Sequence, residues 1–199
     1  SALALAGIKA GIKHFVFTST TALYGYASTP KEVAGWVTEQ VTPKPKSVYH
    51  KSKIRAETKL EEISNLFNLP VTVLQMSRCF PEPADLMAVY RLTRGVDARA
   101  VDTRLSGFNR FIISGSTPFT VSDCDNLYRD ASAIIEQQCP ELAAAFQQRG
   151  WSLPTSLDRV YDSSAAQDKL GWSSKHGSAS VLDMLDNESA EVLPTLKRR

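Results

Sequence analysis

Apolar residues form short runs in some stretches of this chain and recur at helical spacing in others. The run at 14–20 is rich in β-branched and aromatic residues and ends in hydroxyl side chains, which predicts a buried strand. Residues 71–76 form a similar run directly after Pro70. Between them, apolar positions three and four apart predict a helix over about 47–68, with Ser47 as its N-cap. This alternation is typical of a parallel α/β sheet.

The remaining patterns are weaker. Residues 26–46 contain prolines and few periodic apolar positions, so we expect an irregular loop beside the site. In that loop Trp36 either closes over a substrate or packs in a satellite core. A further strand is predicted at 110–113. The spacing then predicts helices over 121–138 and 140–149, and we expect them to form a small lobe that covers the cleft and sets substrate choice.

Composition narrows the class of protein. Hydrophobic residues make up 43% and charged residues 22% of the chain, which is ordinary for a globular domain. A net charge of +2 is too small to indicate a nucleic-acid partner, and no apolar run reaches the length of a membrane span. We therefore expect neither nucleic acid nor a membrane as a partner.

Cysteine and histidine positions suggest neither disulfides nor a metal site. Cys79, Cys124 and Cys139 are odd in number and far apart. They predict free thiols in a reducing compartment, most simply the cytoplasm. The histidines are isolated along the chain, and no metal-ligand spacing is present.

Tyr49 and Lys53 are the main candidates for chemistry. They lie four residues apart near the start of the predicted helix and so share one face. An ammonium group one turn away stabilises a phenolate, which suits a general acid/base. The hydroxyl cluster 18–21 and the segment 77–81 follow the two strands, where ligands of parallel sheets bind. Alone the tyrosine-lysine pair is a weak signal, because Lys53 could instead snorkel from the edge of the core.

Four segments together carry a resemblance. They are the strand and Tyr-Gly pair in 14–25, the acidic and proline-containing lead 39–49, the continuation 51–57, and the elements Asp162-Ser163-Ser164 and Lys169-Leu170-Gly171-Trp172. In this order and spacing they resemble the extended short-chain dehydrogenase/reductase family, in its branch of NAD-dependent epimerases and dehydratases. The resemblance implies a Rossmann-like parallel sheet with a small, mostly helical C-terminal substrate lobe.

The resemblance also implies roles for particular residues. Thr20 takes the position of the catalytic Ser/Thr, Tyr49 that of the acid/base, and Lys53 would support Tyr49 and hold the nicotinamide ribose. Ser19, Tyr49, Lys53 and Phe80 would contact the cofactor. That cofactor would be NAD or NADP, with NAD slightly favoured. The reaction would occur at a secondary-alcohol carbon of a sugar-like or other small substrate, and epimerisation, dehydration and dehydrogenation stay open.

The chain departs from the family plan at several places. No Gly-rich turn joins a strand to a helix, so we expect residue 1 to fall about halfway through a Rossmann domain. We expect 1–82 to form the active-site half of that domain, and 83–199 to hold the remaining strand and the lobe. We also hypothesise that a short helical piece is absent near Arg99. Pro81, where many family members have asparagine, puts a standard UDP-sugar in doubt, and Arg91 and Arg94 are candidates for an anionic substrate group.

Two other interpretations stay open. One is a non-catalytic protein of the same fold that binds a dinucleotide as a sensor or scaffold. The other is an unrelated α/β domain with a coincidental motif. The resemblance further implies a homodimer, with the outer face of the tyrosine helix, including Val48, Arg55 and Leu66, as its contact surface.

Overall fold

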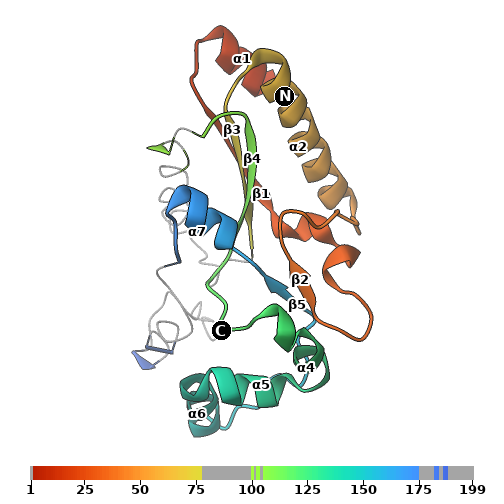
Figure 1. The fold of residues 1–199 in the computed structure, drawn as a ribbon, viewed down its shortest axis with the longest axis vertical. Coiled ribbons are helices and arrows are strands. Elements are labelled where there is room, and N and C mark those ends of the chain that lie inside the picture. The colour runs from red at the N-terminus through yellow and green to blue at the C-terminus, as the bar shows by residue number, and fades with distance from the viewer. Residues whose placement is uncertain are drawn as a thin grey trace, which may run out of the picture.

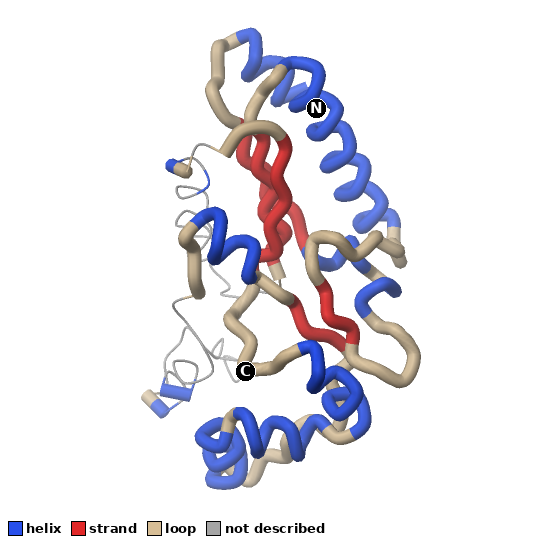
Figure 2. Tube along the Cα trace, viewed as in Figure 1, coloured by secondary structure: helices blue, strands red, loops and turns tan. Residues whose placement is uncertain are grey.

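Three parallel strands form the centre of the molecule (Figures 1 and 2). The computed structural model describes residues 2–77, 100, 102, 103, 105–174, 182, 183, 186 and 187. The strands are β1 (Phe15–Thr20), β3 (Val71–Met76) and β4 (Phe108–Ile113), in the order β1-β3-β4. The predicted parallel α/β architecture is confirmed, and the strands at 14–20 and 71–76 agree with the structure to within a residue.

Helices α1 (Ala2–Lys9) and α2 (Val48–Phe67) cover one face of this sheet (Figure 1). Leu60 and Ile63 of α2 are buried against Val71 and Val73 of β3, and Ala4 of α1 joins the same cluster. Burial of each large apolar side chain contributes about 1.5–3 kcal/mol, so this contact fixes α2 against the strands. Within the described residues, no helix combines the length and apolar character that a membrane crossing requires.

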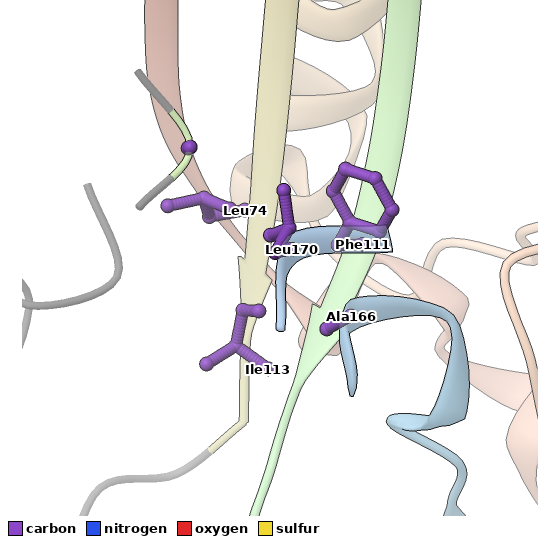
Figure 3. Close-up of a cluster of buried hydrophobic side chains, with 6 residues drawn as sticks. Leu74, Phe111, Ile113, Ala166 and Leu170 are labelled. Atoms are coloured by element: carbon purple, nitrogen blue, oxygen red, sulfur yellow. The ribbon is translucent and has the colours of Figure 1, made fainter. Parts of the chain in front are cut away.

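The opposite face of the sheet is covered by α7 (Ser164–Leu170). Figure 3 shows Ala166 and Leu170 of this helix against Leu74 of β3 and the β4 residues Phe111 and Ile113. Because successive residues of a strand point to opposite faces, β3 and β4 are buried on both sides. This agrees with the mostly apolar sequence of β3 and with the apolar second half of β4, residues 111–113.

Helix α2 begins and ends where the sequence predicts. The Ser47 hydroxyl accepts a hydrogen bond from the backbone N–H of His50 at 3.3 Å, which caps the first turn. Asn68 ends the helix in the left-handed conformation, with φ of 51°. Of the apolar residues spaced three and four apart in this helix, Leu60 and Ile63 are buried, but Phe67 is 47% exposed. Phe67 is the last residue of the helix.

A second, two-stranded parallel sheet corrects the expected irregular loop. Strand β2 (Gly35–Val37) lies within 26–46 and pairs with β5 (Arg159–Tyr161). Three residues are too few to show an alternating pattern, so this strand gave no signal in the sequence. The Trp36 indole donates a hydrogen bond to Asp162 at 3.1 Å and packs on a small core, which agrees with the satellite-core alternative.

The helical lobe differs from prediction at one point. The expected helix over 121–138 is divided into η3 (Val121–Asp123), α4 (Cys124–Arg129) and α5 (Ala131–Gln138), followed by α6 (Pro140–Gln148). The break falls at Asp130, whose backbone leaves the helical region and whose carboxylate caps the N–H of Ala133 at 3.2 Å. Aspartate competes for backbone donors in this way and favours a helix start over a helix interior.

The loop before α2 is tied at its two ends. The N–H of Tyr26 donates to the carbonyl of Lys44 at 2.9 Å, and the N–H of Lys44 donates to the carbonyl of Tyr24 at 3.0 Å. Gly25 lies between them with φ of 55°, and a Cβ there would lie 2.0 Å from the Lys44 carbonyl oxygen. We call this close approach of Gly25 to Lys44 the neck of the loop, and only glycine fits there. The neck joins η1 (Thr21–Tyr24) and η2 (Tyr26–Ser28) to the residues that lead into α2.

Candidate active site

Lys53 connects helix α2 to the carboxyl end of β1. Its Nζ donates a hydrogen bond to the backbone carbonyl of Thr18 at 3.2 Å and lies 5.1 Å from the centre of the Phe17 ring. The same Nζ is 5.9 Å from the centre of the Tyr49 ring, one turn earlier on the helix. The structure therefore brings the predicted tyrosine-lysine pair to the strand end that carries the hydroxyl cluster.

Tyr49 lies in the first turn of α2 and is 53% exposed. Its ring meets that of His50 edge-on, with 6.0 Å between centroids. His50 lies in the same first turn and binds the segment that precedes the helix, because its Nδ1 accepts the N–H of Lys46 at 3.1 Å. The phenol of Tyr49 is thus accessible from solvent on a helix end that is capped and fixed.

Thr20 is the last residue of β1. Its Oγ1 accepts a hydrogen bond from the N–H of Ala22 at 3.2 Å, which starts η1. That bond uses an oxygen lone pair, and the hydroxyl proton is still able to donate to a ligand. Thr20 and the carbonyl that receives Lys53 are two residues apart on one strand, which places the predicted catalytic side chains at one end of the sheet.

Ser19 has a different environment from its neighbours. It is buried, and its hydroxyl donates to Oε1 of Glu57 at 2.6 Å. Its side chain therefore points toward α2, in agreement with the alternation of a strand. Ser19 was predicted to lie near the cofactor, whereas its contact with Glu57 was not predicted.

Glu57 is the centre of a buried polar network that the sequence argument missed. Gln75 donates from Nε2 to both of its oxygens at 3.2 and 3.0 Å, and Nε of Arg110 donates to Oε2 at 3.2 Å. Arg110 also pairs with Glu61 at 2.6 Å. A signal was present: Glu57 falls between Lys53 and the buried Leu60 at helical spacing, where a charge needs partners.

Tyr24 extends this network. Its hydroxyl donates to Oε1 of Gln75 at 2.7 Å. Burial raises the pKa of Tyr24, and the nearby carboxylates of Glu39 and Glu57 raise it further, so this phenol remains a neutral donor. Glu39 in turn accepts the N–H of Ile112 at 2.7 Å and so covers the outer edge of β4.

A pocket of about 280 Å³ lies beside the network. Its lining is partly polar and partly apolar, and it comes from η1, the loop before α2, α2 itself, and strands β3 and β4: Tyr24, Glu39, Gln40, Val41, Thr42, Pro43, Ile54, Glu57, Thr58, Gln75 and Arg110. None of the predicted catalytic residues lines it. The pocket therefore adjoins the Glu57 network, and the tyrosine-lysine pair lies outside its lining.

Some predicted residues cannot be placed. Phe80, which was expected at the cofactor, and Pro81 lie outside the described residues, as do Arg91 and Arg94. The chain near Arg99, where we hypothesised that a short helical piece is absent, also lies outside them.

Comparison with known proteins identifies a family. The sequence model of the "NAD dependent epimerase/dehydratase family" matches residues 2–118. No curated protein matches the chain. Among solved structures, the UDP-N-acetylglucosamine 4-epimerase from Bacillus cereus is 18% identical, with a TM-score of 0.57 over 92% of this chain and 66% of its own.

Two further structures show the same fold. RMD from Pseudomonas aeruginosa, complexed with NADPH, is 15% identical with a TM-score of 0.53, covering 90% of this chain and 68% of its own. The dTDP-glucose 4,6-dehydratase from Bacillus anthracis, in complex with NAD, is 17% identical with a TM-score of 0.53, covering 97% and 67%. The chain thus spans about two thirds of the length of these structures.

Proposed function

The chain belongs to the NAD-dependent epimerase/dehydratase family, a family of enzymes, and from this premise we propose that it supplies the acid/base half of such an active site. The main support is the position of Lys53, which lies beside the Tyr49 ring and binds the end of the strand that bears Thr20. Tyr49 takes or returns the proton of a substrate hydroxyl, and Thr20 donates to the same oxygen. Lys53 stabilises the charge that forms on Tyr49.

The described residues fit the nicotinamide end of a dinucleotide. Lys53 has three N–H donors, and its bond to the Thr18 carbonyl uses one of them, which leaves donors for a ribose hydroxyl. The bound nicotinamide supplies a hydride acceptor or donor. We propose that Ser19 remains near it through its place beside Thr20, while its hydroxyl donates to Glu57, and that Phe80 lies against it. We favour NAD slightly over NADP.

The substrate we propose is a sugar nucleotide oxidised at a secondary alcohol. Support comes from the two neighbours named above as acting on UDP-N-acetylglucosamine and dTDP-glucose. The open position of Tyr49 at the helix end suits a large, polar substrate that approaches from solvent. Epimerisation and dehydrogenation both begin with this oxidation and need the same three side chains.

We also propose a cytoplasmic homodimer. Free Cys124 and Cys139 fit a reducing compartment. Val48, Arg55 and Leu66 are all exposed on one face of α2, with Val48 at 83% and Leu66 at 77%. Light scattering of the intact protein tests the dimer, and a charged substitution at Leu66 should shift it toward monomer.

The test of the proposed function is Tyr49→Phe in the intact protein. Removing the phenolic proton carrier should lower turnover of nucleotide sugars by about 10²–10⁴-fold, the usual contribution of general acid/base catalysis. Dinucleotide affinity, measured by titration with NAD and NADP, should change little. Retained turnover in the variant would remove the acid/base assignment, and dinucleotide binding without any turnover in the natural protein would favour the sensor or scaffold.

A further inference from the structure

One stripe of helix α2 passes from solvent into the sheet. Tyr49, Lys53 and Glu57 follow one another at intervals of four residues and so lie on adjacent turns. Tyr49 is 53% exposed, Lys53 reaches the edge of β1, and Glu57 is 4% exposed. The function proposed above uses the first two side chains and leaves the third unexplained.

The Glu57 carboxylate binds one side chain from each strand of the sheet. It accepts hydrogen bonds from Ser19 of β1 at 2.6 Å, from Gln75 of β3 at 3.0 and 3.2 Å, and from Arg110 of β4 at 3.2 Å. Ser19 and Gln75 are direct neighbours across the strands. A buried carboxylate is costly unless its oxygens are filled, so few positions of α2 along the sheet satisfy it.

This contact adjoins the proposed chemistry. Ser19 lies between Thr18, whose carbonyl accepts Lys53, and Thr20, whose hydroxyl faces the proposed substrate site. We propose that Glu57 is a positioning residue, which sets the distance between the Tyr49-Lys53 turn and the end of β1. The apolar contacts of Leu60 and Ile63 hold the helix on the sheet, but they allow α2 to slide along it. The hydrogen bonds of the Glu57 carboxylate do not allow this, because they depend on distance and direction.

The proposal rests on the proposed function, and the test is Glu57→Gln in the intact protein. Glutamine keeps the size of the side chain but presents an NH₂ group where the carboxylate accepts a donor. Glu61→Gln is the matched control, because Glu61 also pairs with Arg110 but is 43% exposed and lies a turn further from Lys53. Thermal unfolding of each variant establishes the temperature range in which it is folded.

Two readouts separate positioning from general stability. In the folded range, kcat of Glu57→Gln should fall about 10–100-fold with a much smaller change in KM, as expected for displaced catalytic groups. Lys53 should also be acetylated faster by a small N-hydroxysuccinimide ester, as measured by peptide mass spectrometry, because its bond to Thr18 is loosened. Glu61→Gln should change neither quantity. A lower melting temperature with unchanged kcat and unchanged Lys53 acetylation would overturn the proposal.

The acetylation readout needs no turnover. If the natural protein showed no activity, the proposed function would fail, but the Lys53 rates would still decide whether Glu57 positions this turn. Should Glu57→Gln not fold, Arg110→Met removes the β4 contact from a side chain that is 32% exposed. It should raise the Lys53 rate by a smaller factor, and an unchanged rate in this variant would overturn the proposal.

Discussion

Two neighbouring turns of α2 use charged side chains in opposite ways. In the turn of Lys53, the ammonium has one hydrogen bond within the described part of the chain, to a backbone carbonyl, and the phenol beside it is half exposed. In the turn of Glu57, the carboxylate is buried and accepts four hydrogen bonds from three strands. Donors that bind no protein group can bind a ligand, whereas acceptors that are already bound can only fix the structure. One turn of α2 therefore serves the proposed reaction, and the next turn holds the helix in place.

Replacing Lys53 should have the largest effect on activity and little effect on stability. Lys53→Met retains the aliphatic stem and removes the charge, so we expect a loss of about 10²–10⁴-fold in kcat/KM, with little change in the free energy of unfolding. Steady-state kinetics and urea unfolding measure the two effects. Lys51→Met, at an exposed position on the same helix, is the control. Equal losses in both variants would contradict a special role for Lys53.

Replacing a residue on the buried face of α2 should affect stability. Leu60→Ala should lower the free energy of unfolding by about 2–5 kcal/mol, because Leu60 is 3% exposed and its loss leaves a cavity above β3. At temperatures where the variant is folded, kcat should stay close to that of the natural protein. Leu66→Ala at a 77% exposed position should cost far less. Equal costs at the two positions would mean that this face of α2 is not the packed one.

Ser47 caps the turn of α2 that holds Tyr49, and its replacement should affect stability. Ser47→Ala removes the acceptor for the His50 N–H and should cost about 1 kcal/mol. Ser47→Asp, which restores an acceptor at the helix start, should recover most of this. Thermal unfolding of the three proteins measures the effect, and a loss that aspartate does not recover would point to a different role for Ser47.

The smallest effect is expected at the opposite end of β1. Burial lowers the pKa of His14 below its ordinary value of 6.5, and its Nε2 lies 2.9 Å from the Thr72 hydroxyl. Because the unfolded chain binds this proton more readily, the contribution to stability is complete above pH 6.5 and is lost as pH falls below it. His14→Gln should therefore flatten the decline of melting temperature between pH 7 and 5. An unchanged decline would show that other groups cause it.

The sequence was sufficient for the parts of the fold that have strong periodicity. Strands 14–20 and 71–76 and helix 47–68 have either a continuous apolar run or a long amphipathic stripe with recognisable caps, and each was predicted nearly to the residue. Strand β2 was missed because three residues have no measurable period. The break at Asp130 was missed because a capping aspartate also occurs within exposed helix faces.

The candidate site divides in a similar way. Tyr49, Lys53 and Thr20 could be proposed from spacing and resemblance, since their relation is local or follows from the ends of parallel strands. The partners of Glu57 could not, because Ser19, Gln75 and Arg110 meet only after three strands have taken their register. Polar residues inside apolar runs mark such contacts in advance, but they do not say which partner each one finds.

The neck at Gly25 and Lys44 has a consequence for how this protein can diversify. The loop tip at 30–32 is exposed, and the neck closes before the chain reaches Ser47. Doubling the length of a closed loop costs only about 0.6 kcal/mol, so inserted residues at the tip would leave the helix and its chemistry in place. Evolution or a protein engineer could therefore graft new recognition elements at 30–32 without retuning the reaction, provided that position 25 stays glycine.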